Sequence, residues 1–310
     1  MKQFIIKVCF FVTLSLLSFI IFLRYNGKYI DYFYDKFTTP KQYSMIIGDS
    51  RTFDGILPKV LDSCFANTII KKPTYNFSFT VAQAVYGPSY LEAIKRKLNT
   101  DSNNQLFILQ VTPWMLANRN PTIQEQSDDY LQNFPPHNMM DMSSNPNFEY
   151  LLKNFKNFNF KGFIRKNSIL YKDGHLVNNN LPKNKIQFEE WKNKQLSIFS
   201  NWKDEWTITD YRFHWLEETV KYLNNYGTIV FVRMPFDKEF LMIENKFCPD
   251  FNNIIENIAR ENKVIFLDYS ELSNWSTFDG HHLNEEGAHL FSRTIALDIL
   301  KNYYKNANSN

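Results

Sequence analysis

The sequence has little cysteine and no pattern typical of metal binding. Its 310 residues include three cysteines, Cys9, Cys64 and Cys248, and no Cys-x-x-Cys pair. Neither these nor the six histidines have the spacing of a structural metal site, so we expect no metal and no other cofactor. Cys9 lies in an apolar run, which leaves Cys64 and Cys248 as one candidate disulfide. Two separate thiols are the favoured alternative.

The sequence also has little excess of charge of either sign. Lys and Arg total 35, Asp and Glu total 32, and the formal net charge is +3. Outside the extreme N-terminus no segment concentrates Lys and Arg, which excludes an electrostatic case for a nucleic-acid partner. Hydrophobic residues make up 44% and aromatic residues 17%, enough for a buried core. The length fits one large domain, or one domain with a long insertion.

The N-terminus carries one long apolar segment. From Phe4 to Leu23 the chain is apolar or hydroxyl-bearing except at Lys7, and about twenty such residues span a bilayer as a helix. No short core with an Ala-x-Ala cleavage pattern is present, so residues 1–24 are predicted to be an uncleaved signal anchor. Positive charges flank both ends and fix the orientation poorly. The usual arrangement puts the body outside the inner (cytoplasmic) membrane, facing the periplasm or cell exterior, and we adopt it. Residues 25–42 are predicted to form a stalk.

The remaining 43–310 alternate between apolar strands and amphipathic helices. Continuous apolar runs predict buried parallel strands, and helical spacing predicts the helices that cover them. The strands are expected at Ser44–Ile47, Thr74–Phe79, Leu106–Val111, Thr228–Val232 and Lys263–Asp268, and the helices at Ser89–Leu98, Asp210–Tyr226 (closed by Gly227), Asp250–Glu261 and Glu285–Tyr303 (capped by Asn284).

This alternation predicts an α/β fold with a parallel sheet covered on both faces. In such sheets the reactive groups gather beyond the carboxyl ends of the strands. The regularity fails over about 115–206, which is predicted to be an inserted cap or lid. Its aromatic residues suggest either a sugar-stacking platform or, the favoured interpretation, the core of the insertion.

Two short motifs lie at the expected reactive rim. Gly48-Asp49-Ser50 directly follows the first body strand, where a serine becomes a nucleophile if a base removes its proton. Asp279-Gly280-His281-His282 precedes the last helix, and an Asp and a His three residues apart can place the carboxylate on one ring nitrogen and leave the other for the serine. Each motif alone is weak evidence for a catalytic site. The evidence is stronger for the two together, because one follows the first strand and the other precedes the last helix of the alternating region.

On these two motifs the sequence resembles the SGNH, or GDSL-type, hydrolases and acyltransferases. The resemblance implies a three-layer, flavodoxin-like fold, with Ser50 as nucleophile, His282 as general base and Asp279 orienting it. His281 is an alternative base if the loop geometry differs. The family's usual Gly of the second block and Gly-x-Asn-Asp of the third are missing. The candidate oxyanion donors are therefore Ser50 itself, Asn76, Ser78 and Thr112.

The anchor, Arg51 after the serine, a Pro-Trp after the third strand and the long middle segment are similar to a narrower branch. That branch contains membrane-anchored proteins that modify envelope polymers, such as the D-alanyl-transfer protein of teichoic acid assembly and the alginate O-acetyltransferases. This similarity implies a membrane-bound O-acyltransferase partner and a glycan or envelope polymer as substrate. Arg51 and Arg233 are candidate substrate-binding residues. For Arg233, an ion pair with Glu244 is the alternative.

The leading hypothesis is a membrane-anchored serine acyltransferase or esterase that moves an acetyl or similar group to an envelope polymer. A plain carboxylic ester hydrolase with the same three residues is the first alternative. A non-catalytic, membrane-tethered partner or polymer-binding protein is the second.

Overall fold

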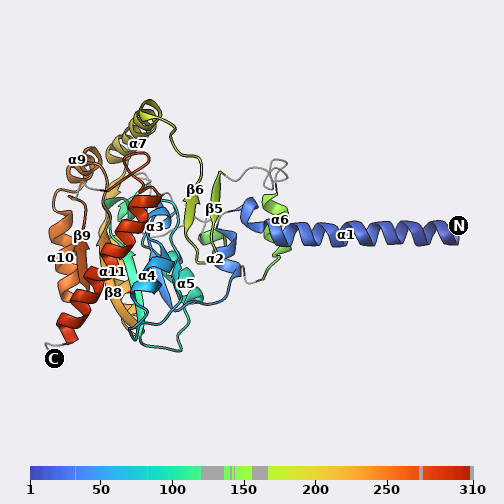
Figure 1. The fold of residues 1–310 in the computed structure, drawn as a ribbon, viewed down its shortest axis with the longest axis horizontal. Coiled ribbons are helices and arrows are strands. Elements are labelled where there is room, and N and C mark those ends of the chain that lie inside the picture. The colour runs from blue at the N-terminus through green and yellow to red at the C-terminus, as the bar shows by residue number, and fades with distance from the viewer. Residues whose placement is uncertain are drawn as a thin grey trace.

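A five-stranded parallel sheet forms the centre of the molecule (Figure 1). The structure, a computed structural model, describes residues 1–31, 33–81, 83–119, 136–139, 142, 144–155, 167–271 and 275–307. The strands lie in the order β2-β1-β3-β8-β9, which is the flavodoxin-like order of a doubly wound sheet. Their bounds are β1 (Ser44–Ile47), β2 (Thr74–Asn76), β3 (Gln105–Gln110), β8 (Gly227–Arg233) and β9 (Ile265–Asp268).

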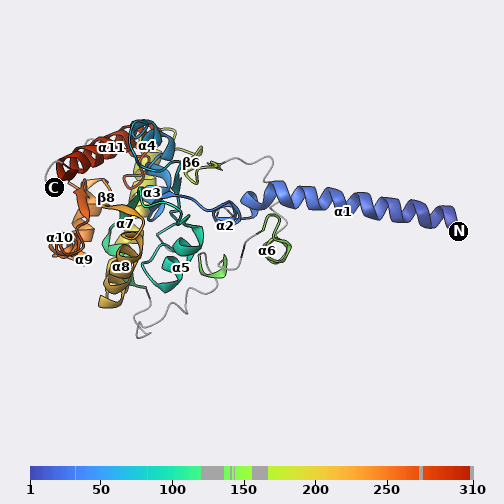
Figure 2. The same ribbon diagram turned by 90° about the horizontal axis from the view of Figure 1, so that it is seen from below.

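Helices cover both faces of this sheet, because alternate strand residues are apolar on both sides. One face buries Ile47, Phe107 and Phe231 against α5 (Pro88–Lys97), α8 (Asp210–Leu223) and α10 (Phe251–Glu261). The other buries Ile46 and Ile108 against α4 (Pro58–Cys64) and α11 (Glu285–Ala307). Figure 2 shows α4 and α11 on one side, with α5 and α8 on the other. The predicted three-layer α/β fold is confirmed.

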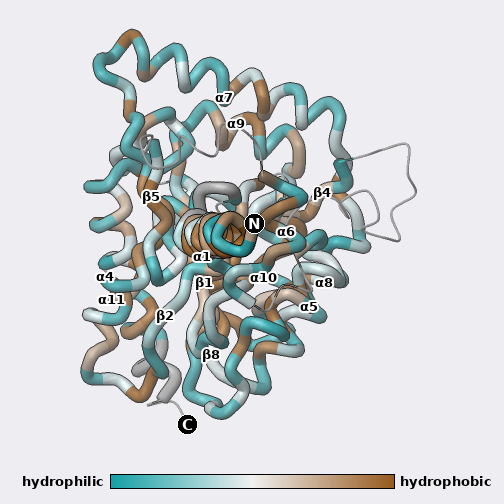
Figure 3. Tube along the Cα trace, turned by 90° about the vertical axis from the view of Figure 1, so that its right-hand side faces the viewer, coloured by the Kyte–Doolittle hydropathy of each residue, from teal (hydrophilic) through white to brown (hydrophobic). Residues whose placement is uncertain are grey.

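A single helix, α1 (Lys2–Ile30), projects from this body (Figure 1). Its segment Lys2–Tyr25 is long and apolar enough to cross a membrane, and Figure 3 looks down its apolar length. At its inner end Leu23 is fully buried and the Phe22 ring lies 6.0 Å from that of Phe155. The helix therefore packs against the body.

The segment predicted as a stalk, 25–42, holds the end of α1 and the short helix α2 (Tyr34–Thr38). Lys36 of α2 is fully buried, and its ammonium donates to the carbonyl oxygens of Asn76 (2.5 Å) and Gly174 (2.7 Å). Burial lowers the pKa of this amine well below its usual range. Through Lys36, this segment is tied to β2 and to the middle of the chain.

Of the predicted insertion, 115–206, the structure describes everything but 120–135, 140, 141, 143 and 156–166. The described parts are β4 (Ala117–Asn118), paired with β7 (Thr207–Ile208), a 3-10 turn at His137–Met139, α6 (Phe148–Asn154), the hairpin β5 (Ser168–Leu170) and β6 (Leu176–Asn178), and α7 (Lys185–Glu205). The hairpin lies against α3 (Ser50–Gly55), and α7 packs on α9 (Lys238–Phe247), where the Phe199 and Phe240 rings are 5.5 Å apart.

The ends of three predicted elements can be compared with the structure. Asn284 caps α11 as predicted, since its side chain accepts from the Gly287 amide at 2.9 Å. The strand predicted to reach Phe79 ends at Asn76. The prediction that Gly227 closes a helix is wrong: α8 ends at Leu223, and Gly227 begins β8. A Cβ there would lie 2.0 Å from the Gln105 carbonyl oxygen, so the glycine permits the close pairing of β8 with β3.

Gly227→Ala should destabilise the body by at least about 3 kcal/mol, because the obstructing atoms belong to the backbone of the neighbouring strand β3, which cannot move aside as a flexible side chain can. Urea unfolding of the detergent-solubilised chain, followed by tryptophan fluorescence, measures this. Gly55→Ala is the matched control, since its Cβ would meet only the flexible ends of Met234 and Leu283 and should cost no more than about 1–2 kcal/mol. Equal midpoints for the two variants would contradict the prediction.

Candidate active site

The turn after β1 fixes the position of Ser50. At Gly48 a Cβ would lie 2.4 Å from Thr52 Oγ1 and 2.5 Å from Gln110 Oε1, so only glycine fits. The next amide, of Asp49, donates to Gln110 Oε1 at 2.7 Å. The Asp49 carboxylate then caps α3 by accepting from the Arg51 amide at 2.8 Å. Ser50 is thereby held as the first residue of α3.

The loop before α11 presents the imidazole. Asp279 Oδ1 accepts from the backbone amides of His281 (3.0 Å) and His282 (2.8 Å). Its Oδ2 lies 2.8 Å from His282 Nδ1. Gly280, between them, has φ +75°, a conformation that other residues adopt only with strain. One carboxylate thus fixes both the loop and the ring.

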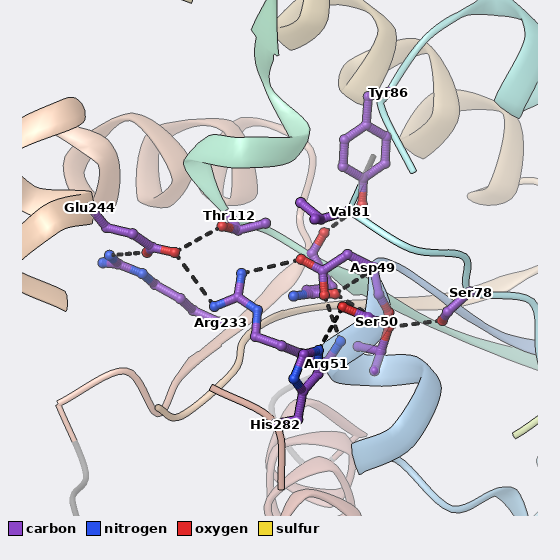
Figure 4. A network of polar contacts seen from close by, with 12 residues as sticks. Asp49, Ser50, Arg51, Ser78, Val81, Tyr86, Thr112, Arg233, Glu244 and His282 are labelled. Carbon is purple, nitrogen blue, oxygen red and sulfur yellow. Dashed lines mark hydrogen bonds and ion pairs between the residues drawn. The ribbon is translucent and has the colours of Figure 1, made fainter. Parts of the chain in front are cut away.

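The two motifs meet at the carboxyl rim of the sheet. His282 Nε2 lies 2.9 Å from Ser50 Oγ, although the two residues are 232 positions apart (Figure 4). A hydroxyl beside an imidazole that is oriented by a carboxylate is the arrangement from which serine nucleophiles are activated. The structure brings all three of the predicted catalytic residues into one hydrogen-bonded chain.

The charges around the Ser50–His282–Asp279 hydrogen bonds favour the protonated form of the His282 ring. Burial alone would lower the pKa of His282, but the charge and hydrogen bond of Asp279, with the charges of Asp54 and Asp49, raise the pKa to about 9. Burial alone would raise the pKa of the Asp279 carboxyl. The charge of His282 and the hydrogen bonds from the loop outweigh the effect of burial and lower this pKa. The pair is built to hold a proton on the ring.

His281, the alternative base, faces a different environment. Its ring lies 4.5 Å from that of Phe199 and 5.3 Å from that of Phe240. Both ring nitrogens are buried, and neither has a hydrogen-bond partner among the residues that the structure describes. Burial, with the neighbouring charges of His282 and Arg51, holds its pKa well below the usual range. The hydrogen bond to Ser50 comes from His282, and His281 packs among aromatic rings.

Three of the predicted oxyanion donors are engaged in other hydrogen bonds. Asn76 Nδ2 donates to the carbonyls of Thr52 (2.7 Å) and Ile56 (3.1 Å), and Asn76 Oδ1 accepts from the Ser78 amide (3.1 Å). The Ser78 hydroxyl accepts from Thr52 Oγ1 (2.8 Å). Thr112 Oγ1 donates to Glu244 Oε1 (3.1 Å). Ser50 offers its own amide in the first turn of α3, where helix amides have no acceptor within the helix. Its role as an oxyanion donor stays a prediction.

The two predicted substrate-binding arginines lie in a buried ion network (Figure 4). Arg51 contacts Asp49 (3.3 Å) and Glu244 (3.4 Å), and the other oxygen of Glu244 accepts from Arg233 at 3.0 Å. Both arginines and Glu244 are no more than 2% exposed. The structure contains the Arg233–Glu244 pair that the sequence offered as the alternative, and this network ties the Ser50 turn to β8 and α9.

Two polar residues at the site were not identified from the sequence. Gln110 ends β3 and holds the Asp49 amide. Asp54 lies one helical turn after Ser50, and burial, the first of several causes, raises the pKa of its carboxyl to about 7. The (i, i+4) spacing of Asp54 from the nucleophile was a signal that could have indicated it.

Within the described residues, no group of three or more His, Cys, Asp and Glu side chains is placed to hold a metal ion. Cys64 and Cys248 are free thiols rather than a disulfide.

Comparison with known proteins adds little. No protein-family model and no curated protein matches the chain. Among solved structures, Est24, a carbohydrate acetylesterase from Sinorhizobium meliloti, is similar at a TM-score of 0.38 and 9% identity, over 84% of this chain and 99% of that one. So distant a likeness carries no conclusion about this chain.

Glu244→Gln should destabilise the body by about 3–5 kcal/mol, because it leaves two buried guanidinium groups with one carboxylate fewer. Urea unfolding measures the change. Glu256→Gln, on the exposed face of α10, is the control and should alter stability by less than about 0.5 kcal/mol. A loss below about 1 kcal/mol in Glu244→Gln would show that the network is not needed for folding.

Asp279→Asn should lower the pKa of His282 from about 9 by at least about one unit, because the burial penalty then acts against a weaker attraction. NMR of the histidine ring signals across pH measures this, with His282→Gln to assign the signal. Asp101→Asn, in the exposed loop before β3, should leave the value unchanged. A pKa that stays near 9 in Asp279→Asn would assign the effect to Asp54 or Asp49 instead.

Proposed function

We propose that this chain is a serine acyl-transfer enzyme held at a membrane by α1. The observation that carries the proposal is the 2.9 Å contact of Ser50 Oγ with His282 Nε2, on a ring whose Nδ1 lies 2.8 Å from Asp279. A structural histidine needs neither a serine on one side nor a buried carboxylate on the other. The two contacts together are what a nucleophile and its base require.

In the first half-reaction Ser50 Oγ attacks the carbonyl carbon of an acyl donor. His282 takes the serine proton and passes it to the leaving oxygen as the donor's ester bond breaks, leaving the acyl group on Ser50. In the second half-reaction an acceptor hydroxyl attacks this ester. His282 takes the acceptor's proton and returns it to Ser50 Oγ as the serine ester bond breaks. Because the neutral ring is the base, turnover should rise with pH towards the pKa of about 9.

The acceptor proposed here is a hydroxyl of an envelope glycan or polymer, and the acyl group is acetyl or similar. The helix α1, long and apolar enough to span a membrane, supports a fixed position beside a membrane-borne donor. The proposal places the body on the outer side of the cytoplasmic membrane. It also includes a membrane-bound O-acyltransferase that supplies the acyl group from the other side.

Hydrolysis is the second candidate function. The His282 side chain keeps 13% of its surface exposed and Ser50 is also partly exposed, so water can reach the serine ester. A non-catalytic role is favoured only by the hydrogen bonds that engage Asn76, Ser78 and Thr112 away from the nucleophile.

A serine-directed fluorophosphonate should form an adduct with Ser50 in the full chain. Ser50→Ala should abolish the adduct and lower turnover of an activated acetyl ester by at least about a thousandfold, and Asp279→Asn should lower turnover by about a thousandfold or more. Ser63→Ala, on the exposed side of α4, is the matched control and should behave as the parent chain.

An unlabelled Ser50 in folded protein would refute both enzymatic functions. If Ser50 is labelled, incubation with the acetyl ester and candidate glycans separates the two by mass spectrometry. Acylated glycan supports transfer, whereas release of free acid alone supports hydrolysis.

A further inference from the structure

A cavity of about 370 Å³ lies beside the candidate triad. It is bounded by α3 and α4 on one side, by the β5–β6 hairpin on another, and by the start of α11. The side chains that line it include many hydrogen-bonding groups, among them Asp54, His175, Asn178, Asn179, Asn284 and Glu285. A concave site with several convergent polar groups is where a small polar ligand or part of a larger one binds.

The cavity adjoins the reactive atoms without containing them. Asp54 lies one turn of α3 after Ser50, and Phe278, which lines the cavity, stacks on the His282 ring at 5.4 Å. Leu283, directly after His282, lines it too. Ser50 and His282 themselves are outside the lining. A ligand unit in the cavity would therefore be a neighbour of the unit that reacts.

Asp54 has hydrogen-bonding capacity that the protein leaves unused. Its Oδ2 accepts from Asn178 Nδ2 at 2.8 Å, while its Oδ1 is buried and has no hydrogen-bond partner within the described part of the chain. The residue is only 9% exposed, and a buried polar atom left unpaired costs free energy, which a ligand hydroxyl would recover once the carboxyl turns Oδ1 towards the cavity. Burial raises the pKa of this carboxyl to about 7, so near neutral pH it is present both as an acceptor and as a donor. A hydroxyl complements either form.

The hairpin that carries Asn178 is held in place at its turn. The hairpin turn is fixed to β2 by the hydrogen bond from the Asn76 amide to the Asp173 carbonyl (2.8 Å) and by the Lys36 ammonium on the Gly174 carbonyl (2.7 Å). Gly174, at φ +85°, has no room for a Cβ against the Asn76 carbonyl. Asn178 is thus presented by a fixed hairpin, which lowers the entropy cost of binding.

The lining of the cavity has no excess of positive charge to attract an anionic ligand. Its acidic residues are Asp54 and Glu285, and its basic residues are Lys59, His175 and His289. Amide and carboxylate groups are suited to the alternating donors and acceptors of uncharged hydroxyls.

From these observations we propose that the cavity binds a neutral sugar unit of the acceptor glycan, next to the unit whose hydroxyl receives the acyl group. Asp54 and Asn178 are the hydroxyl-binding pair. The identification of this sugar as part of an acceptor rests on the function proposed above, whereas binding of a neutral saccharide does not.

Binding is tested on the full chain carrying Ser50→Ala, which prevents turnover, in a detergent without a sugar headgroup. Cellotriose, maltotriose and N-acetylchitotriose are the neutral probes and trigalacturonate is the anionic one, each titrated at millimolar concentration by isothermal calorimetry. At least one neutral trisaccharide should bind, and trigalacturonate should bind at least about tenfold more weakly. Binding of none of the neutral probes, or equal binding of trigalacturonate, overturns the proposal.

Asn178→Ala, added to Ser50→Ala, should weaken neutral binding by at least about tenfold, and Asp54→Ala, which removes both carboxyl oxygens, is the second variant and should do the same. Circular dichroism shows whether each is folded, and either folded variant suffices for the test. Asn253→Ala, on the exposed surface of α10, is the matched control and should bind as the parent does. Undiminished binding in a folded cavity variant overturns the assignment to this cavity.

The two proposals fail separately. If the chain with Ser50 intact reacts with the fluorophosphonate but binds no neutral saccharide, the cavity proposal fails and the acyl-transfer proposal stands. If the chain binds the saccharide through Asn178 but Ser50 stays unlabelled, the acyl-transfer proposal fails and the proposed saccharide site stands.

Discussion

The backbone at Gly48 runs so close to the side chain of Gln110 that no other residue fits, and the site depends on that approach. It brings the Asp49 amide onto Gln110 and lets the Asp49 carboxylate cap α3, so that Ser50 starts the helix facing His282. The same carboxylate pairs with Arg51, and through Glu244 this ion network reaches Arg233 of β8. The close approach at Gly48 therefore positions the turn, and the ion network ties the same turn to β8. The four charges of this network, on Asp49, Arg51, Glu244 and Arg233, are buried, and each needs its partner because the interior does not solvate it.

Much of the architecture was predictable because its signals are local. Ser44–Ile47 and Leu106–Val111 are apolar except at Ser44 and Gln110, and burial on both faces of a parallel sheet favours that pattern. The two motifs that supply the candidate triad could also be identified from the sequence, since each lies at a strand or helix boundary. Their meeting at 2.9 Å follows from the convergence of such boundaries at one rim.

The features missed depend on contacts between distant segments. The helix α9 buries Glu244 beside Phe240, so a charged residue interrupts the apolar pattern by which a helix is recognised. Gly227 looked like the end of a helix because its real constraint, the Gln105 carbonyl, lies in another strand. Asn76, Ser78 and Thr112 were reasonable oxyanion candidates by position. At a rim where many polar side chains gather, however, most of them bond to one another, and spacing alone does not show which are used.

The fit between α1 and the body has a mechanical consequence. The helix runs unbroken from Lys2 to Ile30, Leu23 is fully buried at its inner end, and Lys36, six residues after the helix ends, is bonded inside the body. Among the described residues, the segment that could span a membrane, Lys2–Tyr25, is joined to the body by the end of α1 and by α2. If α1 spans a membrane, as proposed above, the body would turn with the helix. A thinner bilayer that tilts α1 would tilt the reactive rim through the same angle, so lipid composition would set the orientation of the site.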